Sequence, residues 1–270
     1  MPVRLIATDI DGTLLNRQGV IPPENVSAIR DAQKAGITVA VASGRFPENV
    51  HLLLEDYGLR CPVIGENGGN IVDEQLRPIQ RRLMNGDAAR QVQAVLEKNG
   101  ADYFIFGSHA ICTSSASVPH HSELVYGQRI TAMGFSYYHG TEAARAFVRE
   151  GVHKFYVCNN VPLALIRERL RGIDGILITQ SGPGNIEIMP EGVDKGRGIQ
   201  DFAERMGIGL EEVMALGDEE NDIPMLAIAG YGVAMGNGSE KTKAAARYVT
   251  DTNQNGGFAK AVRRYALQEG

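Results

Sequence analysis

Two aspartates stand two residues apart, directly after the first apolar run of the chain. The run covers Val3 to Ala7, and the segment Asp9-Ile10-Asp11-Gly12-Thr13 follows it. Residues i and i+2 of an extended chain point to the same side, so both carboxylates would face one crevice if the chain stays extended. Two such carboxylates repel each other unless a cation lies between them. The spacing therefore points to a cation-binding site.

Two other interpretations apply to the same motif. An Asp-Gly pair also forms plain turns in which the carboxylate caps nearby N–H groups, and for the pair taken alone this alternative stays open. A calcium-binding loop is the second alternative. It fails because its glycine falls at the wrong offset and because the twelfth position counted from Asp9 is Val20, where a glutamate is needed.

A second acidic cluster, Gly217-Asp218-Glu219-Glu220-Asn221-Asp222, follows an apolar run at Val213–Leu216. By itself it is also typical of the acidic first turn of a helix, which the helix dipole favours. Combined with Asp9 and Asp11, it offers a set of hard oxygen ligands that suits magnesium and disfavours zinc. The one pair of adjacent histidines, His120-His121, points apart in a loop, so we discount zinc.

Two further segments supply a hydroxyl, backbone N–H groups and a positive charge. Ser43-Gly44-Arg45 follows an apolar run at residues 37–42, where a hydroxyl and the start of a helix would hold an oxyanion. A plain serine N-cap is the alternative. Lys195 follows another run, Ile186–Met189, which we expect to be a strand of the same sheet. A lone lysine is usually solvated, and only this position makes it a candidate.

The elements that would position these residues alternate between strand and helix. The apolar runs of the first 64 residues are unbroken, which is typical of parallel strands buried on both faces. The same rhythm returns after Gly184. In open α/β sheets, ligands bind outside the carboxyl ends of the strands, where the strand order reverses. The four segments are therefore expected to meet in one crevice.

The middle of the chain has a different pattern of predicted helices and strands. We expect a helix capped by Asp87, a strand at Tyr103–Phe106, a polar loop or strand pair at Ala110–Ser122, and further strands and helices up to Gln180. The predicted fold is a doubly wound, mostly parallel, Rossmann-like α/β core sheet with an inserted α+β domain. Residues 1–82 and 185–270 would form the core domain, and residues 83–184 the insertion.

The combined set of carboxylates, a divalent cation, a lysine and a helix start is typical of a phosphoryl-transfer site. A carboxylate that attacks a phosphate faces a repulsion of about 1 kcal/mol per charge pair at 4 Å in water, and about 4 kcal/mol at an effective dielectric of 20. The metal and the lysine would offset it. The motifs of P-loop, dinucleotide-binding and serine-hydrolase proteins are absent from the sequence.

These motifs are similar to those of the haloacid dehalogenase superfamily, and the chain resembles its Cof-type phosphatases with a type IIB cap. The segments that carry the resemblance are Asp9–Leu15, Ala42–Arg45, Lys195-Gly196, Gly217–Asp222, Gly232–Asn237 and Asn255–Gly257. The resemblance implies that the inserted domain is a cap that closes over the crevice. The turn Glu66-Asn67-Gly68-Gly69 also resembles one of the family, and we assign it a structural role.

The resemblance also implies a role for each acidic residue. Asp9 would be the nucleophile that forms an aspartyl-phosphate, with its other oxygen on Mg²⁺. Asp11 would protonate the leaving alkoxide and then take a proton from the attacking water, while its backbone carbonyl binds the metal. Asp218 would be the remaining side-chain ligand, with Asp222 in support of the metal site.

Four residues would hold the phosphoryl oxygens according to the same resemblance: Ser43, Gly44, Lys195 and Asn221. The implied activity is Mg²⁺-dependent hydrolysis of small phosphate monoesters, most often sugar phosphates. A phosphomutase of similar architecture is one alternative, and a specialised phosphatase for a flavin precursor or pyridoxal phosphate is another. A catalytically silent phosphate sensor is disfavoured, because every charged position of the motifs is present.

Composition narrows the choice of partners. The 270 residues include 27 Lys and Arg against 32 Asp and Glu, a net charge of −5, so no basic excess favours nucleic acid. No segment reaches the roughly 20 apolar residues that span a bilayer, and Asp9 comes too early for a signal peptide. The three cysteines form no CxxC pair. We expect a cytoplasmic protein, a monomer or small homo-oligomer, that binds a small phosphorylated metabolite.

Overall fold

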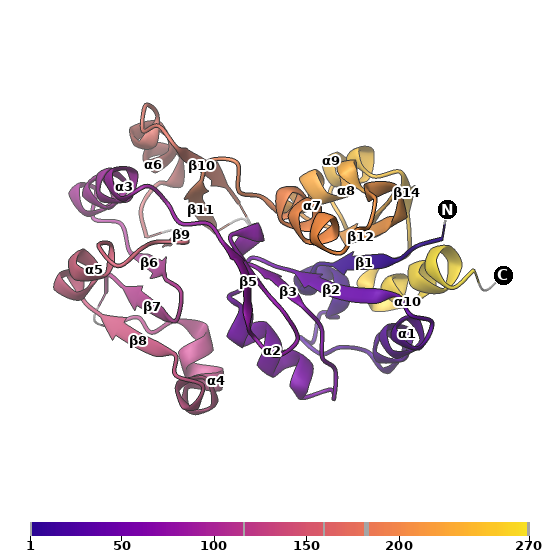
Figure 1. Cartoon of the computed structure of the whole chain (residues 1–270). Coiled ribbons are helices and arrows are strands. Elements are labelled where there is room, and N and C mark those ends of the chain that lie inside the picture. Colours follow the sequence, from indigo (N-terminus) through magenta and orange to yellow (C-terminus); the bar gives the residue numbers. More distant parts are fainter. Residues whose placement is uncertain (1, 116, 159, 181–183, 269–270) are drawn as a thin grey trace. The chain divides into compact units, whose positions relative to one another are not determined.

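The computed structural model describes residues 2–115, 117–158, 160–180 and 184–268, in two compact units (Figure 1). The core unit consists of Met1–Ile79 and Asp194–Gly270, and the inserted unit of Gln80–Val193. The sequence predicted divisions after residues 82 and 184, whereas the packing of the chain divides it after Ile79 and Val193. Each unit is described separately below.

The core unit is built on one sheet with the strand order β14-β13-β12-β1-β2-β3-β4-β5. Its strands are β1 (Leu5–Thr8), β2 (Thr38–Ala42), β3 (Val63–Gly65), β4 (Asn70–Val72), β5 (Pro78–Arg81), β12 (Val213–Gly217), β13 (Tyr231–Ala234) and β14 (Tyr248–Val249). The strands from β14 to β3 are parallel, and β4 is antiparallel to β3. The strand order reverses at β1, which lies between β2 and β12. The predicted doubly wound α/β core is therefore confirmed.

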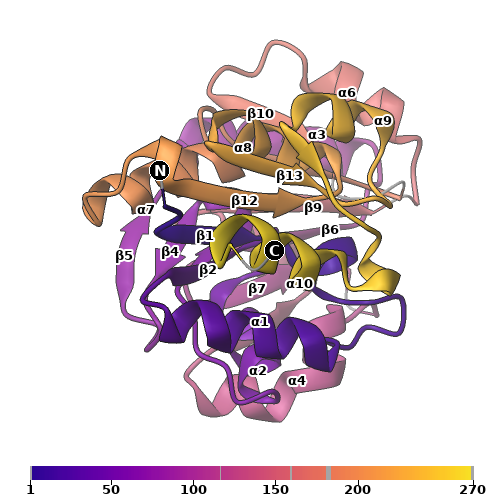
Figure 2. The same cartoon turned by 90° about the vertical axis from the view of Figure 1, so that its right-hand side faces the viewer.

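Helices cover both faces of this sheet. They are α1 (Pro23–Lys34), α2 (Pro47–Glu55), α7 (Lys195–Arg205), α8 (Ile223–Ile228), α9 (Glu240–Ala245) and α10 (Gly257–Ala261). Figure 2 shows α1 and α2 on one side of the strands and α8 on the other. Along β1, Ile6 packs with residues of α1 and α10, whereas Leu5 and Ala7 pack with residues of α7 and α8. This double burial explains why the strands read as unbroken apolar runs.

The inserted unit has its own sheet and its own apolar core. The sheet order is β10-β11-β9-β6-β7-β8, in which neighbouring strands are antiparallel except β7 and β8, which are parallel. Its elements are α3 (Gly86–Lys98), β6 (Tyr103–Phe106), β7 (Ala110–Thr113), α4 (His121–Ala132), β8 (Ser136–His139), α5 (Thr141–Phe147), β9 (Lys154–Cys158), α6 (Leu163–Leu170), β10 (Ile176–Thr179) and β11 (Asn185–Pro190). Val92 of α3, Phe155 of β9 and Ile166 of α6 meet in one buried cluster.

The prediction that the run at Ile186–Met189 belongs to the core sheet was wrong. This run is β11, and it pairs antiparallel with β9 and β10 in the sheet of the inserted unit. A buried strand has the same apolar pattern in either sheet, so the pattern does not reveal its hydrogen-bond partners. Lys195 therefore follows a strand of the other sheet and enters the core unit as the first residue of α7.

Two local predictions in the inserted unit also need correction. Helix α3 is capped by Asn85, whose side chain accepts from the backbone N–H of Asp87 at 2.8 Å, and not by Asp87 itself. The polar segment after β7 leads into α4, which the sequence did not predict; residue 116 lies outside the described residues. Leu124 and Val125 of α4 are 70% and 52% exposed, so this helix shows no apolar stripe on a buried face. His120 caps α4.

Across the described ranges, every helix is too short or too polar to cross a bilayer.

A pair of valines tests the double burial of the core sheet. Val233 of β13 is fully buried, and Val20 in the loop before α1 is 44% exposed. We expect Val233→Ala to lower the free energy of unfolding by about 2 kcal/mol, because it leaves a cavity, and Val20→Ala to change it by less than about 0.5 kcal/mol. Urea unfolding followed by far-UV circular dichroism measures both. Equal losses would contradict the packing described here.

Candidate active site

Segments far apart in the sequence meet at the carboxyl ends of neighbouring core strands. Asp9 follows β1, and its backbone N–H donates to Leu216 O of β12 at 2.9 Å. Asp218 follows β12, and Ser43 follows β2 on the other side of β1. This is the edge at which the sequence placed the crevice.

One ammonium group lies among three carboxylates at this edge. Lys195 Nζ donates to Asp9 Oδ1 and to Asp222 Oδ1, both at 2.6 Å. One carboxylate oxygen from each of Asp9, Asp218 and Asp222 lies within 4.8 Å of the others. All four side chains are buried, and Lys195 is 1% exposed. The cluster therefore places three carboxylates around one ammonium group in a largely buried position.

The protonation of the cluster reflects this arrangement. Burial raises the pKa of Asp9 well above its usual range against the opposing pull of Lys195, and burial and the charge of Asp222 raise the pKa of Asp218 to about 7. Burial by itself lowers the pKa of Lys195, but Asp222 and Asp9 outweigh it and raise that pKa. The lysine therefore stays charged, and Asp9 and Asp218 bind protons more tightly than free aspartates do.

The donors of this cluster fit Mg²⁺. They are carboxylate oxygens, which are hard ligands, and three carboxylates lie around a single ammonium group. Asp9 and Asp218 are the residues that would hold the ion. Within the described residues, this is the one group of three or more His, Cys, Asp or Glu side chains close enough to bind a metal.

The carboxylate of Asp218 is held on both oxygens. Thr13 Oγ1 donates to Oδ1 at 2.9 Å, and Asn237 Nδ2 donates to Oδ2 at 3.1 Å and to the carbonyl of Gly12 at 2.9 Å. Gly12 has φ +84°, and a Cβ at this position would collide with the Asp218 carboxylate, so only glycine fits. Thr13 and Asn237 lie within the sequence motifs, but the motifs alone do not reveal that these side chains hold Asp218.

Asp222 has a supporting place in the cluster. Its Oδ2 accepts from the backbone N–H groups of Asp218 and Glu219, at 2.8 and 3.0 Å, while its Oδ1 accepts from Lys195. These bonds form the turn that presents Asp218 and fix the ammonium of Lys195. Asp222 accepts three such bonds, two of them on Oδ2, whereas Asp218 accepts one on each oxygen, so Asp222 has less capacity left for a metal.

The side chain of Asp11 lies outside this group of carboxylates. It forms an ion pair with Arg45, whose Nη2 and Nε donate to Asp11 Oδ1 and Oδ2 at 2.6 and 2.9 Å, and it is 62% exposed. The prediction that Asp9 and Asp11 face one crevice required an extended chain, and Asp11 keeps an extended backbone (φ −79°, ψ 115°) before the chain turns at Gly12 (φ 84°). The pairing with Arg45 accompanies the place of the Asp11 carboxylate outside the group. A metal contact of Asp11 through its backbone carbonyl stays a prediction.

The residues predicted to hold the phosphoryl group lie on the loops around the cluster. Ser43 is buried, and its Oγ accepts from the backbone N–H of Arg45 at 3.2 Å; Gly44 stands between them. Asn221 is buried in the turn before α8, and its Nδ2 donates to Asn67 Oδ1 at 3.1 Å. The sequence did not predict this hydrogen bond between Asn221 and Asn67.

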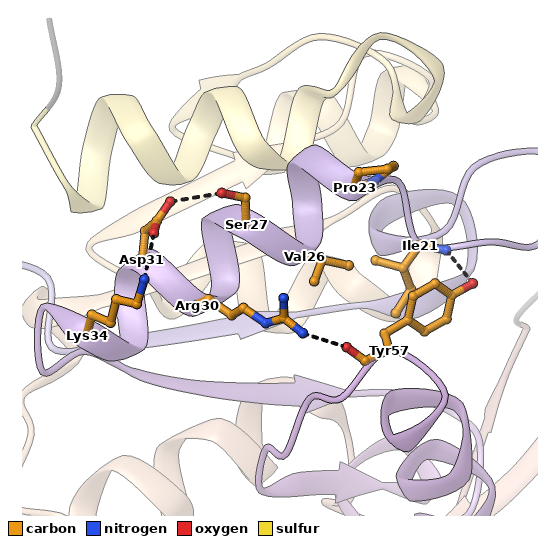
Figure 3. Close-up of a pocket in the computed structure, with 8 residues that line it drawn as sticks. All are labelled: Ile21, Pro23, Val26, Ser27, Arg30, Asp31, Lys34 and Tyr57. Carbon is orange, nitrogen blue, oxygen red and sulfur yellow. Dashed lines mark hydrogen bonds and ion pairs between the residues drawn. The ribbon is translucent and has the colours of Figure 1, made fainter.

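A cavity of about 520 Å³ in the core unit is a separate feature (Figure 3). It is lined by Ile21, Pro23, Val26, Ser27, Arg30, Asp31, Lys34 and Tyr57, so none of the residues of the acidic cluster contributes to it. Arg30 donates to the carbonyl of Tyr57 at 2.9 Å, and Lys34 lies 3.8 Å from Asp31. The charged groups of this cavity are paired with neighbours, and it has no acidic cluster for phosphoryl transfer.

Comparison with known proteins identifies the family. The profile of the haloacid dehalogenase-like hydrolases matches residues 6–262. The chain belongs to this family. The resemblance to its Cof-type members is thereby confirmed, and the chain is a phosphatase of this family.

Relatives and solved structures match along nearly the whole length. A 5-amino-6-(5-phospho-D-ribitylamino)uracil phosphatase of Bacillus subtilis is 31% identical over 98% of this chain and 96% of its own. A haloacid dehalogenase-like hydrolase structure from B. subtilis has a TM-score of 0.84 and 28% identity, covering 97% of this chain and 99% of its own. The subclass IIB sugar phosphatase BT4131 has a TM-score of 0.81 and 27% identity, covering 98% and 100%.

The raised pKa of Asp218 predicts how stability depends on pH when no divalent cation is present. The folded state binds the proton of Asp218 more tightly than the unfolded state, so the free energy of unfolding should fall as pH rises from the ordinary aspartate range to about 7. Its contribution is at most about 1.4 kcal/mol per pH unit. Asp218→Asn should remove this part of the slope, which urea unfolding at pH 5, 6 and 7 with a chelator measures. Parallel slopes for the two proteins would contradict the assignment.

Lys195→Met tests the central ion pairs. The variant keeps most of the side-chain volume but leaves buried carboxylates without their cation, so we expect a loss of about 3–5 kcal/mol in unfolding free energy at neutral pH. The loss should shrink at pH 5, where the carboxylates take up protons. Arg197→Met two residues away, on a side chain 47% exposed, is the control and should cost far less. A Lys195→Met variant as stable as the control would show that the cluster does not depend on this charge.

Proposed function

We propose that this protein is a Mg²⁺-dependent phosphatase that hydrolyses small phosphate monoesters through an aspartyl-phosphate on Asp9, with sugar phosphates as the substrate class. The observation that carries the proposal is the buried contact of Lys195 with Asp9 and Asp222 at the carboxyl end of β1. A carboxylate that already faces an ammonium, in a site short of positive charge, suits the attack on a phosphate dianion.

In the first step, a carboxylate oxygen of Asp9 forms a bond to phosphorus while the bond from phosphorus to the substrate oxygen breaks. Lys195, held by Asp9 and Asp222, offsets the repulsion between the carboxylate and the phosphoryl oxygens. A bound Mg²⁺ supplies further positive charge at the same place. Ser43, Gly44 and Asn221 would donate to the phosphoryl oxygens from the surrounding loops.

Asp11 would move the protons of both steps. Its exposed carboxyl group first donates a proton to the leaving oxygen, then accepts one from a water whose oxygen attacks phosphorus. The bond between phosphorus and Asp9 breaks, orthophosphate leaves and the carboxylate of Asp9 is restored. The ion pair with Arg45 must open for this cycle, because Arg45 donates to both carboxylate oxygens of Asp11, the atoms that would carry the proton.

Two substrate classes find support among the similar proteins. The similarity to the sugar phosphatase BT4131 supports sugar phosphates. The 31% identity to the 5-amino-6-(5-phospho-D-ribitylamino)uracil phosphatase supports a flavin precursor as the second candidate. A phosphomutase would instead return the phosphoryl group to the sugar. The cytoplasmic location and the monomeric or small homo-oligomeric state stay predictions of the sequence.

Asp9→Asn tests the nucleophile. The amide cannot attack phosphorus, so turnover of p-nitrophenyl phosphate should fall by at least about four orders of magnitude, as for other removed nucleophiles. The fold should persist, because the change lowers the negative charge of the cluster; circular dichroism and thermal unfolding check this. Asp31→Asn, in the cavity of Figure 3, is the control and should retain full activity. Turnover by Asp9→Asn close to that of the control would refute the mechanism.

A chelator tests the metal dependence, and a panel of substrates tests the reaction class. A chelator should abolish phosphate release and added Mg²⁺ should restore it, since oxygen ligands without a cation leave the site protonated. Release of orthophosphate from hexose phosphates marks a phosphatase. Conversion of a hexose 1-phosphate to the 6-phosphate with little release would establish a mutase instead. A rate at least tenfold higher with 5-amino-6-(5-phospho-D-ribitylamino)uracil would favour the second candidate.

A further inference from the structure

The turn between β3 and β4 has an unusual backbone. Glu66 and Asn67 both have positive φ angles, 52° and 55°, and both are 1% exposed. Positive φ is uncommon outside glycine, and asparagine is among the few residues that adopt it readily. Two such residues in succession persist only where the surrounding contacts hold them, and such backbone is concentrated at functional sites.

Asn67 joins two loops of the proposed phosphoryl-binding site. Its backbone N–H donates to the carbonyl of Ser43 at 2.9 Å, and its side-chain Oδ1 accepts from Asn221 Nδ2 at 3.1 Å. Ser43 follows β2 and Asn221 lies in the turn that follows β12, so the two loops come from opposite sides of β1. One buried residue therefore bridges both.

The same turn packs against the segment that carries Lys195. A Cβ added to Gly68 would collide with the carbonyl oxygen of Asp194 and would lie 3.3 Å from Gly198 Cα. Asp194 in turn caps α7, where its Oδ1 accepts from the backbone N–H of Arg197 at 2.8 Å. The turn thus contacts the start of the helix from which Lys195 reaches Asp9.

We propose that Asn67 is a positioning residue for phosphoryl binding, acting through Asn221; this rests on the proposed function. An asparagine amide has two N–H donors, and the bond to Asn67 Oδ1 occupies one of them. That bond fixes the plane of the Asn221 amide. It thereby sets the direction of the second N–H, which would donate to a phosphoryl oxygen. The backbone hydrogen bond from Asn67 to Ser43 holds the loop after β2 at a constant distance from Asn67. The donors of Asn221 and of the Ser43 loop are therefore preorganised before the substrate arrives.

Asn67→Gly removes the acceptor while a glycine still adopts the positive φ. We expect kcat/KM for p-nitrophenyl phosphate to fall about tenfold, and the inhibition constant of orthophosphate to rise by a similar factor, which matches the loss of one hydrogen bond. Calorimetric binding of orthophosphate in the presence of Mg²⁺ should weaken to the same extent. Unchanged phosphate affinity would overturn the proposal.

The decisive measurement is the coupling between the two asparagines. If Asn67 acts through Asn221, adding Asn67→Gly to Asn221→Ala should change phosphate affinity and kcat/KM by less than about twofold. A second loss as large as the first would show that Asn67 acts independently, and would overturn the proposal. The double variant separates positioning from a general loss of structure, because a structural defect would lower activity in either background.

Asn85→Gly is the matched control in the inserted unit. It removes the side chain that accepts from the backbone N–H groups of Asp87 and Ala88, so it should lower stability slightly without changing the inhibition constant of orthophosphate. The wild type and Asp9→Asn are assayed alongside. A wild type that releases no phosphate refutes the proposed function. Calorimetry still decides the role of Asn67 in that case, because it requires binding and not turnover.

Discussion

The structure of the site depends on one buried ammonium group shared by two carboxylates. Lys195 contacts Asp9 and Asp222 at 2.6 Å, with Asp218 beside them, and all four side chains are buried. Burying such charges is costly unless each one is paired. This requirement constrains the positions of α7, the turn after β12 and the end of β1. These segments must bring Lys195, the pair Asp218 and Asp222, and Asp9 to the same point.

The residues around the cluster orient its carboxylates. Gly12 leaves room for the Asp218 carboxylate, Thr13 and Asn237 hold its two oxygens, and Asp222 accepts from the turn that carries it. None of these contacts supplies positive charge. They fix the direction of the carboxylates and leave the charge imbalance in place. A site arranged in this way is prepared for a cation and an anionic substrate.

The sequence predicted most of the core because its strands are buried on both faces and read as apolar runs. The same property misled the prediction at β11, whose apolar run pairs in the other sheet. Helix α4 was missed because Ile130 is buried while Leu124 and Val125 are exposed, so its apolar residues form no continuous buried stripe. Asp11 was expected to face the same crevice as Asp9; its backbone is extended, but its side chain pairs with Arg45 and lies outside the group that Asp9, Asp218 and Asp222 form.

By itself, the sequence determined the chemical types in the site: acidic residues after two strands, a serine loop after a third, and a lysine at the start of a helix. Each of these motifs is a short segment of the chain, so it can be identified from the sequence without knowledge of the fold. Only the tertiary structure decided which of them share one buried space, since that depends on strand order and on contacts over 186 residues, as between Lys195 and Asp9. Spacing along the chain carries no information about such distances, because hydrogen bonding between strands and packing of helices on the sheet set them.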